Sequence, residues 1–236
     1  MKRLAEESHF LREQNRLLST SNIKWENLPQ KIFIVHKETD LDFIKDKLEE
    51  LLSWLLDHWR MQNAALELIG VFPKVFEEKL DIKSKVIEFY DSSSQIPEEV
   101  DLILTLGGDG TVLLAAWLFQ EHAPPIVPFH FGTLGFLTIF NWDNFSSRLS
   151  SILVSGSRFN TRLRLYCQIH KIKTKAIVSY NILNEIVIER GASPFMSILD
   201  FFGENTFLTK IQADGVAIAT PTGSTAYSVK HNFDLY

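Results

Sequence analysis

The first half of the chain alternates short apolar runs with a stretch of helical periodicity. Lys31–Lys37 and Leu102–Leu106 are short and apolar, as expected of buried strands. Between them, apolar residues recur every three or four positions from Ile44 to Leu55, which predicts a helix with Asp40 as its N-cap. The same reasoning predicts further strands at Leu66–Val71, Lys85–Phe89 and Ile126–Phe129, a polar loop at Asp91–Gln95 and a helix at Val112–Phe119. Strands that alternate with helices indicate βαβ units and a largely parallel sheet.

The second half changes character after about Asn160. Short β-branched segments follow one another with little helical periodicity, and turn residues separate several of them. The predicted strands are Leu165–His170, Lys175–Ile182, Glu185–Glu189, Ser197–Phe202, Thr206–Ile211 and Val216–Ala219. We therefore expect an N-terminal extension over residues 1–30, an α/β domain over 31–157 and an all-β domain over 158–236.

The N-terminal extension has two interpretations. Leu4, Leu11 and Leu18 recur at a spacing of seven, which puts them on one side of a helix. A solvated leading helix is one interpretation. The other is a mitochondrial presequence, which is amphipathic, rich in arginine and serine and poor in acidic residues. The basic and serine residues before position 22 fit this second interpretation, whereas the glutamates do not, and both interpretations stay open. The compartment expected is the mitochondrial matrix, with the cytoplasm as the alternative.

Composition and charge exclude several classes of protein. The 236 residues are 45% apolar and 22% charged, which is close to an ordinary globular chain. The net charge of −5 argues against a general nucleic-acid binder, which usually has a basic excess. The single cysteine, Cys167, excludes an internal disulfide. No apolar run reaches the length of about 18 residues that a membrane-spanning helix needs, so we expect no membrane segment.

A glycine-rich turn, Gly107–Thr111, separates a predicted strand from a predicted helix. Glycines allow close approach of another molecule to the backbone, and the N–H groups at a helix start form a site for an anion such as phosphate. Asp109 is unexpected there, because a carboxylate repels phosphate. It is explained if it takes a proton from an attacking hydroxyl or holds Mg²⁺ at phosphates. The alternative is a tight turn in which Asp109 only caps the helix.

Three later segments extend this pattern. Gly132–Leu137 follows the next predicted strand, so it can face the glycine turn across the ends of adjacent parallel strands. Asn184-Glu185 pairs an amide with a carboxylate, which suits ribose hydroxyls or a base edge, or else only starts a strand. Ala213–Ser228 combines a short strand with a loop of small hydroxylated residues, which suits a polar ligand, or else forms a surface loop.

Taken in order, these four motifs resemble the NAD kinase family. They are the GGDGT turn at Gly107–Thr111, LGFLT at Leu134–Thr138, the pair Asn184-Glu185 and DG…TPTGSTAYS at Asp214–Ser228. The stretch from Asn184 most resembles fungal mitochondrial NADH kinases. GGDGT alone is shared with lipid kinases, but a lipid kinase does not explain the other motifs. The resemblance implies an α/β domain with a Rossmann-like parallel sheet, followed by an all-β domain with a dinucleotide-binding loop.

The resemblance also implies a role for individual residues. Asp109 is implied to be the catalytic residue that activates the adenosine 2′-hydroxyl of NAD(H). The residues implied to bind phosphates or nucleotide are Gly107, Gly108, Gly110, Thr111, Phe136, Asn184, Glu185, Asp214, Thr225, Ala226 and Tyr227. No residue is implied to be a dedicated metal ligand.

The expected activity is ATP-dependent phosphorylation of NAD or NADH to NADP(H), with Mg²⁺ at the phosphates. The partners implied are NAD(H), ATP and further copies of the chain in a full-length homo-oligomer, without nucleic acid or membrane. Family members continue after Tyr227 with an Ala-Gly-Gly pattern and more strands, whereas this chain ends at Tyr236. The all-β domain is therefore expected to be incomplete here. The alternative function is a truncated, inactive family member that binds nucleotide or a full-length subunit.

Overall fold

The computed structural model describes residues 21–36, 41–61, 67–71, 87–90 and 99–223. The chain divides into two compact units, residues 1–161 and 162–236. Several predictions concern residues outside the described ranges: the leucine repeat of the extension, the N-cap at Asp40, the loop Asp91–Gln95 and the binding residues Thr225, Ala226 and Tyr227. No helix in the described ranges is both long enough and apolar enough to span a bilayer.

The first unit is built on a parallel sheet, as the sequence predicts. Its strands are β2 (Lys31–His36), β3 (Glu67–Val71), β4 (Ile87–Tyr90), β5 (Leu102–Leu106), β6 (Ile126–His130) and β7 (Phe140–Asn141). Their order in space is β4-β3-β2-β5-β6-β7, and every neighbouring pair is parallel. The central strands β2 and β5 are buried along their length, which explains their continuous apolar sequences.

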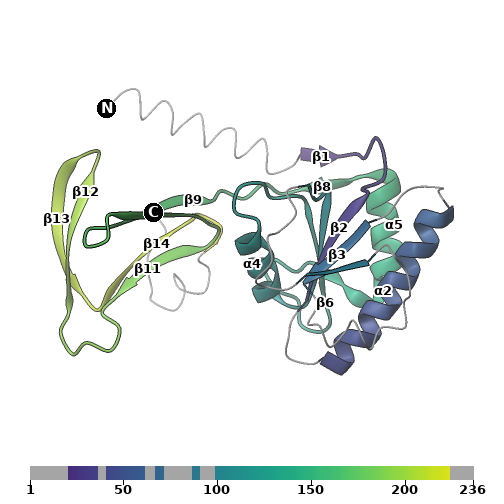
Figure 1. Cartoon of the computed structure of the whole chain (residues 1–236), viewed down its shortest axis with the longest axis horizontal. Helices are drawn as coiled ribbons and strands as arrows, with labels where there is room; N and C mark the ends of the chain where they lie inside the picture. Colours follow the sequence, from purple (N-terminus) through teal and green to yellow (C-terminus); the bar gives the residue numbers. More distant parts are fainter. Residues whose placement is uncertain (1–20, 37–40, 62–66, 72–86, 91–98, 224–236) are drawn as a thin grey trace. The chain divides into compact units, whose positions relative to one another are not determined.

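Helices cover both faces of this sheet (Figure 1). Helices α2 (Leu41–Met61) and α5 (Phe145–Ser155) pack on one face, where Ile32, Ile34 and Leu104 join their apolar residues in a single core. Helix α4 (Asp109–Leu118) lies on the other face, where Phe33 and Ile103 pack with Ala115 and Phe119. Since successive residues of a strand point to opposite faces, each buried strand supplies both cores.

The sheet has a topological switch point between β2 and β5. From β2 the strand order runs outward through β3 to β4, and from β5 it runs the opposite way through β6 to β7. The chain leaves β2 for α2 on one face and leaves β5 for α4 on the other. In open α/β sheets, ligands bind outside the carboxyl ends of the strands at this point. The glycine turn after β5 lies at that edge.

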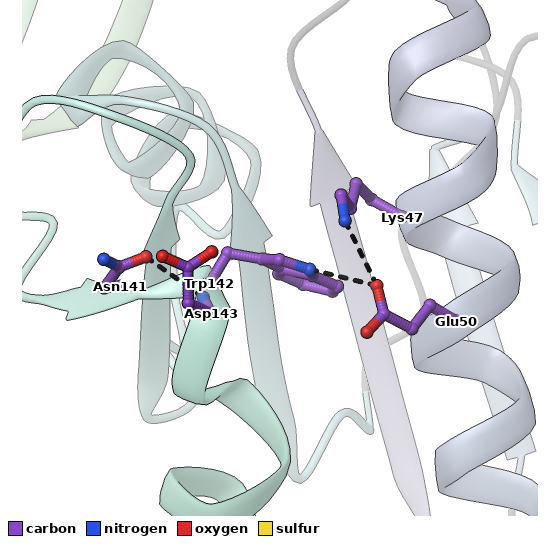
Figure 2. Close-up of polar contacts among 5 residues, drawn as sticks. All are labelled: Lys47, Glu50, Asn141, Trp142 and Asp143. Carbon is purple, nitrogen blue, oxygen red and sulfur yellow. Dashed lines mark hydrogen bonds and ion pairs between the residues drawn. The ribbon is translucent and has the colours of Figure 1, made fainter.

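A polar corner joins α2 to the short helix η1 (Trp142–Asn144), and Figure 2 shows its side chains. The indole Nε1 of Trp142 donates to Glu50 Oε2 over 3.2 Å, and Lys47 Nζ donates to the same oxygen over 3.3 Å. The Asn141 side chain accepts a 3.0 Å bond from the Asp143 N–H at the start of η1. These contacts fix the end of the sheet against α2.

Two short strands also belong to the first unit. Strand β1 (Ser21–Ile23) pairs antiparallel with β8 (Ser157–Phe159). The end of the predicted extension is therefore attached to the α/β unit by backbone pairing. Neither strand is evident in the sequence pattern, because three residues are too few to show a period.

The second unit is antiparallel β structure, which confirms the predicted fold class. Its ladders are β9 (Leu165–Lys171) with β10 (Ala176–Ile182), β11 (Glu185–Glu189) with β14 (Gly215–Ala219), and β12 (Ser197–Gly203) with β13 (Thr206–Ala213). The turn between β12 and β13 has positive φ at Glu204 and Asn205. Many large apolar side chains of this unit are exposed, including Phe195, Phe202 and Phe207.

Candidate active site

The glycine turn leaves open space at the start of α4. Gly108 is the N-cap of the helix and has an extended backbone, and no side chain caps the helix there. The Gly107 N–H donates to the Phe129 carbonyl over 2.9 Å, so the turn is attached to β6. Gly108 and Gly110 are exposed, and a Cβ added to either would meet no atom within 4 Å. No residue in the described part of the chain fills this space, so a ligand can approach the backbone there.

Asp109 binds a second loop instead of capping its own helix. Its Oδ2 accepts a 2.8 Å bond from the Phe136 N–H, and its Oδ1 accepts 2.9 and 3.1 Å bonds from the N–H groups of Leu137 and Thr138. The Thr138 hydroxyl also lies 3.0 Å from Oδ1. The interpretation of Asp109 as the helix cap is therefore wrong, since Gly108 is the N-cap and the carboxylate is used elsewhere. The expectation that the LGFLT segment faces the glycine turn is confirmed.

These bonds set the ionisation of Asp109. Partial burial by itself would raise the pKa of this carboxyl group, because it disfavours the charged form. Hydrogen bonds from the N–H groups of Leu137 and Phe136 and from Thr138 act the other way and prevail, so the pKa of Asp109 lies below its ordinary value. Asp109 is thus a carboxylate throughout the neutral range.

The loop around Asp109 has no room for a side chain at Gly135. A Cβ there would lie 2.1 Å from Asp109 Oδ1 and 2.3 Å from Thr138 Oγ1. Thr138 is fully buried, and its carbonyl accepts a 3.4 Å bond from the Gly135 N–H. Phe136, by contrast, is 69% exposed although its N–H is held by Asp109. The Asp109 carboxylate therefore fixes the backbone of this loop while the Phe136 ring remains available for contact with a ligand.

In the second unit, two of the sequence motifs come together. Asn184 lies at the start of β11, and its carbonyl accepts a 2.8 Å bond from the Thr220 N–H at the end of β14. The buried Thr220 hydroxyl donates to the Leu183 carbonyl over 2.7 Å. A Cβ on Gly223 would lie only 2.5 Å from that carbonyl oxygen, so only glycine fits. The Asn184-Glu185 pair and the TPTG segment therefore form one structural element.

Asp214 lies at the other end of the same ladder. Strand β14 pairs with β11 so that Glu185 is opposite Ala219 and Glu189 is opposite Gly215. Asp214 precedes this last residue, and its Oδ1 accepts a 2.7 Å bond from Arg190 Nε. The structure therefore brings Asn184 and Glu185 together with Thr220 but separates them from Asp214 by the length of the ladder.

The sequence interpretation missed Thr138 and Arg190. Thr138 is the last residue of the LGFLT motif, and a single polar residue after an apolar segment was the available signal. Arg190 also donates to the Ser193 carbonyl, so it closes the turn after β11 as well as binding Asp214. A charge next to a strand end is common at protein surfaces, and no sequence signal distinguishes this one.

A separate pocket lies at the opposite edge of the sheet. It is lined by residues at the amino ends of β2 and β5 and near the end of α4, among them Lys31, Asp101 and Pro124. The Asp101 carboxylate is already engaged by the N–H groups of Gln30 and Lys31. Since the strands are parallel, this pocket is a full strand length from the glycine turn, and we do not assign it to the same site.

These features define a class of protein: a doubly wound α/β unit with a glycine turn and an anchored carboxylate at its switch point, joined to an antiparallel β unit. Comparison with known proteins narrows the class. Residues 32–156 match the family model for the ATP-NAD kinase N-terminal domain, and residues 183–232 match that for the ATP-NAD kinase C-terminal domain. The first match alone covers more than half of the chain, and the protein therefore belongs to the NAD kinase family.

Individual relatives agree with this assignment. The chain is 44% identical to an ATP-NADH kinase of Saccharomyces cerevisiae over 143 residues, which are 55% of this chain and 29% of that protein. It is 35% identical to an NAD(+) kinase of the same organism, over 91% of this chain and 44% of that protein. The chain thus spans less than half the length of these two curated relatives.

Solved structures support the fold. A crystal structure of yeast NADH kinase complexed with NADH matches with a TM-score of 0.71 and 30% identity, over 92% of this chain and 68% of that chain. An NAD kinase from Archaeoglobus fulgidus in complex with ATP matches with a TM-score of 0.55 and 20% identity, over 88% of this chain and 67% of that chain. At that identity the second match supports the fold alone.

Proposed function

We propose that this protein transfers the γ-phosphoryl group of ATP to the adenosine 2′-hydroxyl of NAD or NADH. The observation that carries the proposal is the Asp109 carboxylate, held by four hydrogen bonds next to the open glycine turn at the carboxyl edge of the sheet. The relatives support it, because their names are those of NAD and NADH kinases and one related structure contains NADH.

The chemistry follows from this arrangement. The 2′-hydroxyl oxygen forms a bond to the γ-phosphorus, the bond from that phosphorus to the bridging oxygen breaks, and ADP leaves. The hydroxyl proton passes to the Asp109 carboxylate or to water. Phosphoryl transfer depends mainly on positioning and on charge neutralisation, so one fixed carboxylate and the exposed backbone at Gly108 and Gly110 are proposed as sufficient protein groups. The Thr111 N–H already donates to the Gly108 carbonyl over 2.9 Å, so Thr111 shapes the turn.

Mg²⁺ fits this site only together with ATP. Among the residues that the structure describes, no three histidine, cysteine, aspartate or glutamate side chains are grouped to hold a metal ion. Proteins commonly bind Mg²⁺ through one or two carboxylates plus the phosphates of the substrate. We therefore assign most of the Mg²⁺ ligands to ATP and water, where the ion neutralises phosphate charge.

The remaining residues are proposed to bind the dinucleotide. Asn184 and Glu185 would hold ribose and base groups, with Thr220 fixing the backbone beside them. Asp214 would contact the nicotinamide end, and Phe136 would form a wall of the nucleotide pocket. Thr225, Ala226 and Tyr227 would contact the adenine end.

Two further proposals concern the whole protein. We propose a homo-oligomer, supported by the exposed apolar side chains of the second unit, and size-exclusion chromatography with light scattering tests it. We propose the mitochondrial matrix as the compartment, supported by the basic and serine residues of the extension, with the cytoplasm as the alternative. Imaging of the tagged protein with and without residues 1–20 decides between the two.

The activity is tested with the purified protein, ATP and Mg²⁺, using NAD, NADH and a diacylglycerol as separate acceptors. The expected result is formation of NADP or NADPH and no phosphorylated lipid. The Asp109→Asn variant is the matched control and should lose most of this activity. Lipid phosphorylation, or dinucleotide binding without any product, would refute the proposal.

A further inference from the structure

The two oxygens of the Asp109 carboxylate have different surroundings. Oδ1 lies within 2.9 to 3.1 Å of three donors: the Leu137 N–H, the Thr138 N–H and the Thr138 hydroxyl. Among the residues that the structure describes, Oδ2 accepts one bond, from the Phe136 N–H. A carboxylate oxygen has two lone-pair sites, so Oδ1 is fully used and Oδ2 has one site left. A substrate hydroxyl can therefore meet this carboxylate only at Oδ2.

Thr138 is the main cause of this asymmetry. It is fully buried, and both its N–H and its hydroxyl point to the same oxygen. The Gly135 N–H also bonds to the Thr138 carbonyl, which closes the turn around the carboxylate. Gly135 has no side chain at the point where a Cβ would lie 2.1 Å from Asp109 Oδ1, and this lets the carboxylate approach the loop.

We propose that Thr138 is a positioning residue: its hydroxyl anchors one oxygen of Asp109 so that the other oxygen alone is presented to the substrate hydroxyl. This inference rests on the proposed function, because it supposes that a hydroxyl is the attacking group. It assigns a role to a residue that touches neither substrate nor phosphate and acts only through Asp109.

The anchoring also defines what Asp109 does. The same hydrogen bonds keep the group ionised, with a pKa below its ordinary value. A carboxylate of low basicity is a poor proton acceptor before the oxygen–phosphorus bond forms. Such a carboxylate can still orient the hydroxyl. It can accept the hydroxyl proton late in the reaction, because that proton becomes more acidic as the attacking oxygen bonds to phosphorus. Precise orientation then matters more than basicity, so the anchor should affect turnover.

The test compares three variants of the purified protein. Thr138→Val removes the hydroxyl donor and keeps the branched shape, whereas Thr138→Ser keeps the hydroxyl. Thr105→Val is the matched control, because Thr105 is an equally buried threonine of β5 whose hydroxyl has no hydrogen-bond partner in the described part of the chain. The readouts are kcat and KM for NAD(H) and ATP, and the pKa of Asp109 followed by carbon-13 NMR of labelled aspartate.

We expect Thr138→Val to lower kcat about tenfold to a hundredfold, the range that follows from losing one hydrogen bond to a charged group. The KM values should change little, and the pKa of Asp109 should rise. Thr138→Ser and Thr105→Val should keep the turnover and the pKa of the unmodified protein. Thermal unfolding of every variant shows whether a loss of turnover is a loss of folded protein.

Two results would overturn the inference: equal turnover in Thr138→Val and Thr105→Val, or an unchanged pKa of Asp109 in folded Thr138→Val. If the unmodified protein forms no NADP(H), the proposed function fails separately. In that case the NMR titration still decides whether Thr138 anchors Asp109.

Discussion

Replacing Gly135 by alanine inserts a methyl group where the structure has no space for one. The new Cβ would lie 2.1 Å from Asp109 Oδ1, almost 1 Å less than the 3.0 Å below which such contacts are essentially never seen. The next nearest atom, Thr138 Oγ1, is at 2.3 Å and belongs to a fully buried residue. The Asp109 carboxylate therefore has to withdraw from the loop and break its hydrogen bonds.

The size of the effect follows from these contacts. Inserting a methyl group into a packed site costs about 1–3 kcal/mol. Each lost hydrogen bond to a charged group costs roughly 1.5–3 kcal/mol. Hydrogen bonds from water to the carboxylate compensate part of this loss, because Asp109 is only partly buried. Alanine has less conformational entropy than glycine in the unfolded chain, which offsets about 0.4–1 kcal/mol of this destabilisation. We expect Gly135→Ala to lower the free energy of unfolding by about 2–4 kcal/mol, which corresponds to roughly 5–15 °C in Tm.

Thermal unfolding of the purified protein, followed by circular dichroism, measures this change. Gly132→Ala is the matched control, because it lies in the same loop and its added Cβ meets no atom within 4 Å. We expect Gly132→Ala to keep the Tm within about 2 °C and Gly135→Ala also to lose at least tenfold in kcat. Equal Tm values for the two variants would refute the reasoning, because they would show that the Asp109 bonds to this loop contribute nothing to stability.

Three further predictions follow from the same contacts. Asp109→Asn should lower kcat by on the order of 10²-fold or more. It should also lower Tm, because one of the two acceptor oxygens becomes an amide NH₂ group that faces N–H donors. Steady-state kinetics measures the first effect and calorimetry the second, and full activity would show that Asp109 has no catalytic role. The pKa of Asp109 is lowered in the folded protein, so its contribution to stability is complete above its ordinary pKa of about 3.9 and is lost as the pH falls through the lower, folded-state pKa. In urea unfolding between pH 6 and pH 3, the unmodified protein should lose free energy of unfolding as the pH falls, by an amount that Asp109→Asn does not lose. An identical pH dependence of stability in the unmodified protein and the variant would contradict this. Gly223→Ala should push Thr220 away from Leu183 and raise KM for NAD(H) more than KM for ATP; an equal rise in both would argue against a dinucleotide site at Asn184.

Much of the fold is evident in the sequence, because strands and helices have short periods. The prediction for β5 agrees with the structure at both ends, and β11 does too. No helix is predicted over α5, although Phe145, Leu149 and Ile152 recur at helical spacing and are buried. The first turn of α4 was also missed, because glycine and aspartate are weak helix formers and their place in the helix follows from the turn after β5.

The sequence by itself determined the fold class, the order of an α/β region before an all-β region and the identity of Asp109 as the unusual group in a glycine turn. These properties depend on residues within a few positions of one another, where periodicity and residue type are informative. Only the tertiary structure decided that Asp109 binds Thr138 and that Asn184 lies beside Thr220. Those partners are 29 and 36 residues apart in the chain, and they meet because β5 and β6 end at one edge of the sheet and because β14 pairs with β11. Strand pairing at that distance depends on how the whole unit buries its apolar faces, which no local pattern of residues encodes.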